Sequence, residues 1–352
     1  MIGHIEKLDS ESWVNLPWKQ FRRDLFRLQK RTYKAVREGD TAKARSLQKL
    51  IMRSVAARFL AIRQVTQLNN GKKTAGIDGK LALDFKERFG LEQKLKTQAN
   101  NWKHQGLRSI PIPKKDGSKR ILKVPTISDR AWQCLAKFAL EPTHEAGFHE
   151  RSYGFRPGRS ANDAQKILFS NLSSNSKGYK KRVIELDISK CFDRISHSSI
   201  LKRLIAPKAI KHRYCKMDGS RNSLSFIRQR AFKVFNKEQK QNRYSSKKLL
   251  KQAFPPVPYS EHKFVNVKGD KSPYDGDLVY WSKRNSKFYD NDTSKALKRQ
   301  NHSCAACRLK FTSEERVHLH HVDGNHGNWK YDNLVAIHES CHDYIHMSKS
   351  DS

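Results

Sequence analysis

The sequence predicts an α+β protein built from several parts, and three observations support this. Residues 18–68 carry a helical apolar period. Residues 71–130 alternate short β-rich pieces with Gly and Asp turns. Residues 301–352 gather three of the six cysteines and eight of the fifteen histidines. At 352 residues the chain has room for two or three domains, each with a modest core.

The N-terminal region predicts two helices separated by a break at Gly39-Asp40, with Asp40 or Thr41 as the cap of the second helix. The two apolar stripes are Phe21, Leu25 and Leu28, then Leu47, Leu50 and Ile51. For any single lysine here, a packed surface helix and a direct RNA contact are equally good interpretations. Both can hold, because a long basic side chain packs with its stem and binds with its charged head.

In the middle of the chain, Lys114-Lys115-Asp116-Gly117-Ser118 between two apolar runs predicts a β-hairpin, and residues 131–141 predict a helix. The stretch SYGFRPGRS at 152–160 combines Tyr153, Phe155 and Arg156 with two glycines. Such a mixture suits the binding of a nucleic-acid strand, although an ordinary aromatic turn explains it equally well. We take Lys114, Lys115, Arg120, Arg156 and Arg159 as candidate nucleic-acid-binding residues.

The stretch RVIELDISKCFDRI at 182–195 alternates apolar and polar residues, which predicts a strand that presents Asp187 at its end. A polymerase uses such a carboxylate to hold magnesium. Two-metal phosphoryl transfer requires further acids close to it.

The charge favours a polyanionic partner, since 71 Lys+Arg against 34 Asp+Glu give a formal charge of +37. Nucleic acid is the first candidate, because counterion release rewards many dispersed cations. We expect no membrane span, since no apolar run approaches the roughly 20 residues required. The N-terminus lacks the pattern of a secretory signal, so we expect a location in the bacterial cytoplasm or nucleoid, or in an organelle such as a plastid or mitochondrion.

Residues 206–262 hold 14 Lys+Arg against three acids and the run FPPVP, a composition typical of a basic linker or an RNA-bound arm. Beyond it, we expect Tyr280 and Trp281 to anchor a small basic module.

Four residues near the C-terminus have the spacing of a closed tetrahedral zinc site. They form two tight pairs, Cys304-x-x-Cys307 and His338-x-x-Cys341, separated by thirty residues. A module of about fifty residues is too small to be stable by burial alone, so a structural Zn²⁺ would stabilise it.

Residues 11–205 resemble the reverse transcriptases encoded by group II introns. The blocks LQKRTYKAVREGD, GKKTAGIDG, RSIPIPKKDGSKRILKVPTISDRA, RSYGFRPGRSANDA and ELDISKCFDRISH follow the order of that family. The resemblance implies that Asp187 is the first metal-binding acid, that Ile188 lends a backbone carbonyl, and that Phe192 checks the ribose of the incoming nucleotide.

The family also requires a Tyr-Ala-Asp-Asp hairpin, which this sequence lacks. Its nearest equivalents are YDGD at 274–277 and YDND at 289–292, neither in an apolar strand pair. We therefore expect Asp187, Ile188 and Phe192 to be vestigial and polymerase activity to be lost, unless a complementing reverse transcriptase chain supplies the missing part. SPYDGDLVYWSKR resembles the DNA-binding segment of the family.

The C-terminal segment resembles the HNH (ββα-metal) nucleases, which these intron proteins carry at the same position. The resemblance implies that His320, His342 and His346 hold Mg²⁺ or another divalent cation and that His321 is the general base. The resemblance also implies that Asn333 fixes the loop that orients His321, although in some relatives the equivalent Asn approaches the metal. For His346 a capping or surface role remains an alternative, and His318 replaces the Glu that is usual in relatives.

The predicted division is a helical reverse-transcriptase extension at 1–70, partial fingers and palm at 71–205, a basic linker or thumb remnant at 206–262, a DNA-binding segment at 263–300 and an HNH domain at 301–352. The leading functional hypothesis is a group II intron-encoded protein that binds intron RNA and target DNA and cuts DNA with its HNH domain. The alternatives are a non-catalytic RNA-binding splicing cofactor and a decaying reading frame. The oligomeric state stays open.

Overall fold

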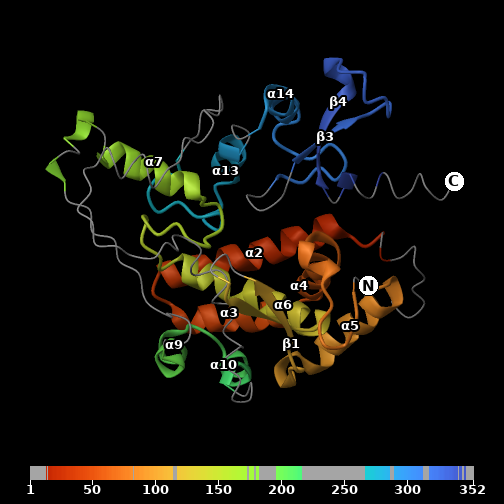
Figure 1. Ribbon diagram of the computed structural model, residues 1–352, viewed down its shortest axis with the longest axis vertical. Coiled ribbons are helices and arrows are strands. Elements are labelled where there is room, and N and C mark those ends of the chain that lie inside the picture. Colours follow the sequence, from red (N-terminus) through yellow and green to blue (C-terminus); the bar gives the residue numbers. More distant parts are fainter. Residues whose placement is uncertain are drawn as a thin grey trace. The chain divides into compact units, whose positions relative to one another are not determined.

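The computed structural model confirms the α+β class with helices and two small antiparallel sheets (Figure 1). The residues that it describes are 13, 15–81, 83–113, 117–172, 174–177, 180–181, 196–215, 266–285, 289–311, 317–339, 341–342 and 345. They divide into two compact units, one comprising residues 1–147 and 196–226, the other residues 148–195 and 227–352. Each unit is described by itself. No helix in the described ranges is long and apolar enough to cross a membrane.

Unit 1 is built from helices. Its elements are α2 (Trp18–Arg37), α3 (Thr41–Arg53), α4 (Val55–Arg63), η1 (Gln64–Leu68), η2 (Asn70–Lys73), α5 (Phe85–Gln98), η3 (Ala99–Asn101), β1 (Arg108–Pro113), β2 (Lys119–Val124), α6 (Ile127–Glu145), α9 (His197–Arg203) and α10 (Lys208–Cys215).

The break between the first two helices is where the sequence predicts it. α2 ends before Gly39, whose positive φ of 80° suits glycine, and Asp40 caps α3 by accepting a hydrogen bond from the backbone N–H of Lys43 at 2.8 Å. One position of the predicted apolar stripes is wrong. Leu50 is 51% exposed, because the buried stripe of α3 follows Leu47 and Ile51 instead.

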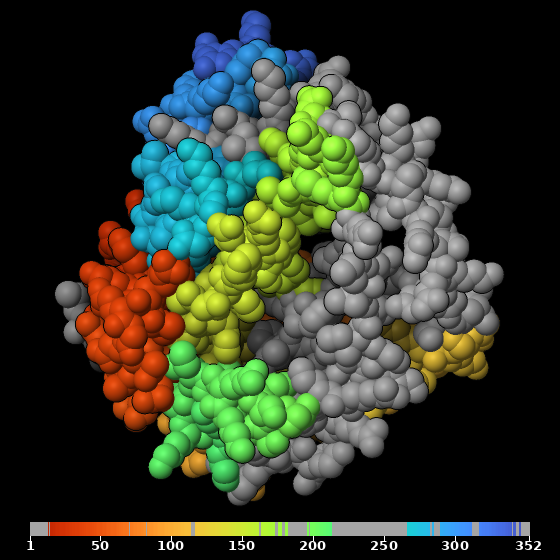
Figure 2. All heavy atoms as spheres, turned by 90° about the vertical axis from the view of Figure 1, so that its left-hand side faces the viewer, coloured from red at the N-terminus to blue at the C-terminus, as the bar shows by residue number. Residues whose placement is uncertain are grey.

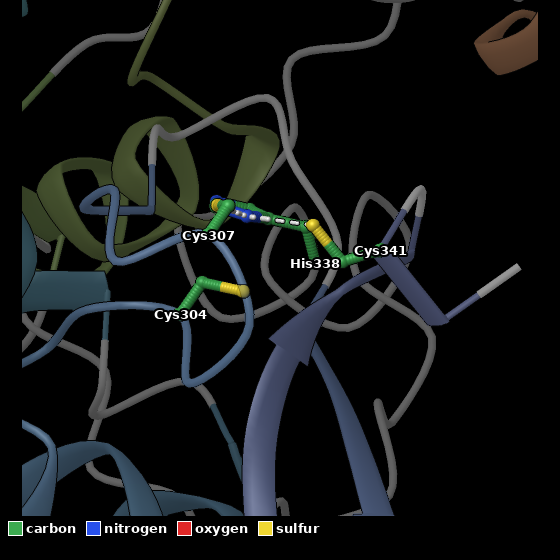
Figure 3. Close-up of side chains that lie close together, drawn as sticks. All are labelled: Cys304, Cys307, His338 and Cys341. Carbon is green, nitrogen blue, oxygen red and sulfur yellow. Dashed lines mark hydrogen bonds between the residues drawn. The ribbon is translucent and has the colours of Figure 1, made fainter. Parts of the chain in front are cut away.

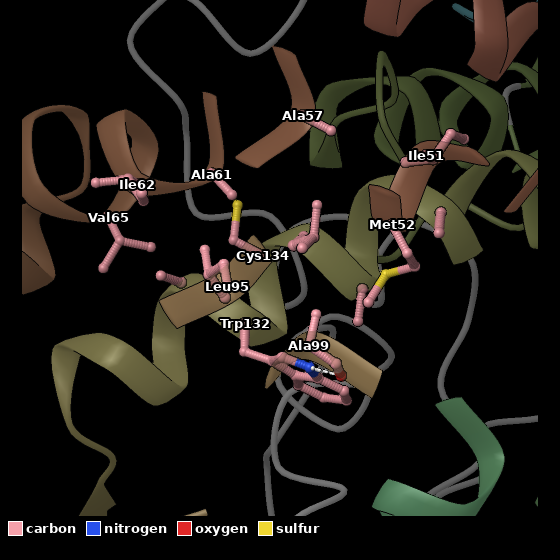
Figure 4. Packing of buried hydrophobic residues seen from close by; sticks show 14 of the residues in the cluster. Ile51, Met52, Ala57, Ala61, Ile62, Val65, Leu95, Ala99, Trp132 and Cys134 are labelled. Atoms are coloured by element: carbon pink, nitrogen blue, oxygen red, sulfur yellow. Dashed lines mark hydrogen bonds between the residues drawn. The ribbon is translucent and has the colours of Figure 1, made fainter. Parts of the chain in front are cut away.

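The core of unit 1 lies among α2, α3, α4, α5 and α6 (Figure 4). Trp132 is fully buried in α6, and its indole N–H donates to the carbonyl of Ala99 at 2.8 Å, so its polar atom is satisfied. The predicted helix at 131–141 is thus the buried centre of α6. The predicted hairpin is also confirmed, because β1 and β2 pair antiparallel on either side of residues 114–118.

The linker interpretation does not fit residues 206–215. α10 starts at Lys208, and Ala206 and Ile210 are only 3% and 2% exposed within the core of unit 1. The high charge of the segment concealed these apolar positions. The rest of the predicted linker, 216–262, lies outside the described residues.

Unit 2 contains α7 (Ala161–Leu172), η4 (Ser174–Ser176), α13 (Leu278–Asn285), α14 (Asn291–Arg299), β3 (Val317–His321), η7 (Tyr331–Asn333) and β4 (Leu334–His338). Two stretches distant in sequence lie side by side in it: Figure 2 shows residues 266–285 in cyan against residues 153–165 in yellow-green. Trp281 is 4% exposed, so it anchors this part as expected. A Cβ at Gly158 would lie 2.6 Å from the Trp281 ring, so only glycine fits there.

A buried ion pair joins these two stretches. Arg284 donates to both carboxylate oxygens of Asp163 at 3.0 Å, and the two side chains are only 4% and 1% exposed. Asp163 also accepts from the backbone N–H groups of Ser160 and Val267. A buried charge pair this well satisfied fixes α7 relative to α13.

The C-terminal hairpin of β3 and β4 packs with α14, through a small core that includes Ala296, Leu297, Phe311, Ala336 and Ile337. α14 therefore belongs with the hairpin, although the predicted boundary at residue 300 assigned it to the preceding segment. We call residues 289–345 the C-terminal module.

Candidate metal centre

Four potential ligands lie together at one end of the C-terminal module (Figure 3). The ligand atoms of Cys304, Cys307, His338 and Cys341 all lie within 4.8 Å of one another. The Nδ1 atom of His338 is 3.3 Å from the sulfur of Cys307 and 3.9 Å from that of Cys341. The structure thus brings together the four residues that the spacing predicts.

Three local structures position these ligands. Cys304 and Cys307 lie on a tight turn after α14, in which the N–H of Cys304 donates to Leu309 and the N–H of Arg308 donates back to Cys304. His338 ends β4 and is 1% exposed, and Cys341 follows it in a helical turn. Because strand, turn and helix each contribute, a bound cation would cross-link the whole module.

The electrostatics of the cluster suit a cation. Hydrogen bonds from Cys307 and Cys341 lower the pKa of the Cys304 thiol well below its usual range. Hydrogen bonding to Cys304 and Cys307 raises the pKa of Cys341 far above its usual range. One thiolate therefore forms readily and the last thiol resists ionisation, since adjacent thiolates repel each other unless a cation lies among them.

A second group of histidines lies on one face of β3 and on the segment after β4. The rings of His320 and His342 have centroids 5.5 Å apart at 85°, and the centroids of His318 and His342 are 5.1 Å apart. The Nε2 atom of His318 is 3.8 Å from a carboxylate oxygen of Glu339. His346 lies outside the described residues. Two of the three predicted cation ligands are therefore adjacent.

His321 ends β3 and is 7% exposed. Its ring contacts the rings of His326 and Trp329, with centroid distances of 5.1 and 5.2 Å. Among the described residues its Nε2 atom has no hydrogen-bond partner. A buried imidazole nitrogen without a partner is costly, so this atom is a candidate for a functional role.

Asn333 fixes the loop between the two strands. Its amide N–H₂ donates to Asp323 and to the carbonyl of Asn328, both at 2.9 Å, and its oxygen accepts from the N–H of Asp323 at 3.0 Å. Hydrogen bonds from Asn328, Asn325 and Asn333 lower the pKa of the Asp323 carboxyl. The loop is consequently held by a ring of polar contacts around one carboxylate.

Among the predicted nucleic-acid-binding residues, Arg120 is exposed on β2. Arg156 is 5% exposed, and its guanidinium donates to the carbonyls of His149 and Ser152. Arg159 donates to the carbonyls of Glu150 and Gly269. These bonds direct both arginines to the backbone of unit 2, which argues against a phosphate-binding role for Arg156. Lys114, Lys115, Asp187, Ile188 and Phe192 lie outside the described residues.

The acids of the two Tyr-Ala-Asp-Asp lookalikes have structural partners. Asp277 accepts from Lys271 and from the N–H of Tyr280 at the start of α13, and Asp290 caps α14 through Thr293. Neither stretch lies in a strand, as expected.

Two features of unit 2 were missed in the sequence. The Asp163–Arg284 pair spans 121 positions, so no local pattern could reveal it. Trp329 and Tyr331 are 61% and 52% exposed on the loop between β3 and β4. Their spacing in NWKYDN was the signal available, since two aromatics in a polar loop are unusual.

Comparisons with known proteins give two family matches, which together cover parts of unit 1 and of unit 2. Residues 13–95 match the family model of the N-terminal domain of reverse transcriptase, and residues 112–267 match that of reverse transcriptase (RNA-dependent DNA polymerase). The second match extends over the predicted linker, and both end before the C-terminal module.

Among curated relatives, the maturase-like protein 1 of Euglena gracilis is 43% identical over 199 residues, which cover 56% of this chain and 43% of that protein. Maturase-like protein 1 of Euglena longa is 40% identical with the same coverage. The group II intron-encoded protein LtrA of Lactococcus lactis is 32% identical over 134 residues, or 38% of this chain and 22% of that protein. The chain thus spans less than half the length of these relatives. Over these ranges the chain is similar to reverse transcriptases, to maturase-like proteins and to a group II intron-encoded protein.

Proposed function

We propose that the chain is an intron-associated protein whose C-terminal module cuts DNA as an HNH nuclease dependent on a divalent cation. One observation carries the proposal: a strand and the segment after the next strand place the rings of His320 and His342 5.5 Å apart. The order of strand, strand and helical turn agrees with the ββα arrangement implied by the resemblance to HNH nucleases.

The donor sets fit two different cations. Three sulfurs and one imidazole nitrogen are the ligands of a structural Zn²⁺, so Cys304, Cys307, His338 and Cys341 would hold it. His320 and His342, with His346 as the expected third ligand, offer imidazoles to a catalytic cation. When bound, that cation would polarise the scissile phosphate and stabilise the leaving oxygen.

His321 is the proposed general base, because its Nε2 atom has no hydrogen bond within the described part of the chain and could accept a proton from water. His321 is 7% exposed and its Nε2 atom is buried, so this role requires that a substrate or water displace a neighbouring side chain. Asn333 keeps the loop that carries Trp329 in place. In this proposal it is a positioning residue.

The test is nicking of supercoiled plasmid DNA by the purified full chain with Mg²⁺ or Mn²⁺. We expect His321→Ala to abolish nicking while the zinc content stays unchanged. The matched control is His212→Ala, which removes an exposed histidine of α10 and should leave nicking intact. Nicking that survives His321→Ala would remove the assignment.

A second candidate function is RNA binding in intron splicing without catalysis, and α2 favours it. Its exposed side carries a continuous basic stripe of Lys19, Arg23, Arg27, Lys30, Arg31, Lys34 and Arg37. Such a stripe can contact successive phosphates of an RNA backbone. Splicing accelerated by His321→Ala protein would support this function, whereas affinity for intron RNA no higher than for bulk polyanion would exclude it.

Target DNA, intron RNA and a complementing polymerase chain are the partners in these proposals. The lack of a Tyr-Ala-Asp-Asp block still predicts no primer extension by the purified chain. Detection of extension would contradict that prediction.

A further inference from the structure

Two aromatic side chains stand exposed beside the proposed nuclease site. Trp329 and Tyr331 are 61% and 52% exposed, and they border a hollow of about 140 Å³. The other lining residues are Asp292, Lys295, Ala296 and Leu334. Exposure of two large aromatic faces is unfavourable in water, so a pair around one hollow indicates a binding surface.

The pair is held in place before any ligand binds. The guanidinium of Arg299 lies 4.2 Å from the centre of the Tyr331 ring and donates to the carbonyls of Tyr331 and Leu334. Trp329 follows Asn328, whose side chain donates to Asp323 at 2.6 Å. A platform that is already ordered loses little conformational freedom on binding.

The charges around the hollow favour a neutral ring over a phosphate. Lys295 lies 3.6 Å from Asp292, both of which line the hollow, and the side chain of Asp332, next to Tyr331 in the chain, is 98% exposed and 4.0 Å from Arg299. These acids offset the neighbouring cations, so the hollow itself is no anion site. The chain as a whole carries a formal charge of +37, which attracts the phosphates of a nucleic-acid strand. The bases of a strand bound in this way could then reach Trp329 and Tyr331.

We propose that Trp329 and Tyr331 form a stacking site for an unpaired base of a nucleic-acid strand. Stacking on aromatic side chains tolerates any base, because every base has a π face, and a paired base within a duplex does not expose its face. The occupant is therefore a single-stranded or extruded nucleotide.

The position of Trp329 connects this site to the proposed chemistry. Its ring meets the His321 ring edge to face, with centroids 5.2 Å apart at 88°. A base stacked on Trp329 would bring its own sugar and phosphate close to His321. This step rests on the proposed nuclease function, and it implies a substrate with an unpaired nucleotide next to the cut.

The binding test uses the full chain with zinc and without Mg²⁺, and two oligonucleotides labelled with 2-aminopurine, one single-stranded and one duplex. We expect Trp329→Ala and Tyr331→Ala each to weaken single-strand binding about tenfold and to reduce the quenching of 2-aminopurine, with little change for the duplex. Trp329→Phe should retain most of the affinity. The matched control is Phe169→Ala, which removes an aromatic side chain that is 60% exposed on α7 and should change nothing.

Single-strand affinity of Trp329→Ala equal to that of Phe169→Ala would overturn the stacking site. A change in self-association of Trp329→Ala would also overturn it, since the ring would then belong to a protein interface. Loss of cleavage in Trp329→Ala with single-strand binding intact would overturn it as well, since the ring would then only position His321. If stacking is lost in Trp329→Ala while cleavage survives His321→Ala, the stacking site stands and the nuclease proposal fails. Zinc content equal to that of the unmodified chain verifies folding of each variant.

Discussion

The two units are stabilised by different interactions. Unit 1 packs its helices, α10 included, around an apolar core in which Ile62, Leu95, Trp132 and Leu135 are fully buried. The described residues of unit 2 have a smaller apolar core, and two polar groups also join their pieces: the Asp163–Arg284 pair joins two distant stretches, and a Cys/His cluster lies where turn, strand and helix meet. The difference is one of degree: unit 1, which also contains the buried Arg58–Glu92 ion pair, is stabilised mainly by apolar burial, whereas the short pieces of unit 2 bury less apolar surface and depend more on polar contacts.

The largest expected effect is that of removing one ligand of the Cys/His cluster, because it concerns the contacts of unit 2 alone. We expect Cys304→Ala to lose bound zinc and the ordered C-terminal module, because structural zinc contributes about 10–16 kcal/mol of apparent binding free energy to folding. Metal analysis and hydrogen exchange of β3 and β4 would measure this. Unit 1 should keep its protection.

The control for this prediction is Cys134→Ala, which removes a buried thiol of the unit 1 core and should leave zinc content unchanged. Conversely, Trp132→Ala should destabilise unit 1 by about 3–5 kcal/mol with zinc retained. Protection of β3 and β4 that persists in metal-free Cys304→Ala protein would contradict a structural role for the cluster.

The buried ion pair of unit 2 gives the next largest expected effect and tests how far a polar contact stabilises this unit. Arg284→Ala should destabilise the contact of α7 with α13 by about 3–5 kcal/mol, because the carboxylate of Asp163 would stay buried without its charge partner. Hydrogen exchange of α7 and α13 amides would report the loss. The double variant Asp163→Asn with Arg284→Met should recover most of the protection, and equal loss in both variants would refute the charge explanation.

The smallest expected effect is a pH dependence in unit 1 that comes from Asp129, one of its buried carboxylates. Burial acts to raise the pKa of Asp129, but hydrogen bonds from His104, Trp102, Gln105 and Thr126 outweigh it and lower the pKa below its ordinary value. The ionised group therefore stabilises the fold above the unfolded pKa of about 4, and this contribution is lost as the pH falls toward the folded pKa.

Unfolding free energies of unit 1 between pH 3 and 7 would test this. Asp129→Asn should cost about 1–3 kcal/mol at neutral pH and flatten the acid limb. Trp102→Phe removes one donor and should flatten it only in part. An acid limb that is unchanged in Asp129→Asn would assign the dependence to another group.

Local patterns in the sequence predicted much of what the structure contains. The cap at Asp40, the hairpin around residues 114–118 and the helix through Trp132 each depend on residues close in the chain. The Cys/His cluster could also be anticipated, because two paired spacings fix the ligands. The catalytic roles of His320, His321, Asn333 and His342 remain predictions, as does every role assigned to Asp187.

Which polar residues are buried, and what they contact, became clear from the folded structure. Arg156 lies in a stretch whose composition suited phosphate binding, yet its guanidinium donates hydrogen bonds to backbone carbonyls. Residues 206–215 had the charge of a linker, yet Ile210 packs in a core. Helices, strands and the paired spacing of the metal ligands could be predicted from the amino-acid sequence, since they depend on neighbours within a few residues. Burial and long-range pairing, such as Asp163 with Arg284, depend on segments that only folding brings together.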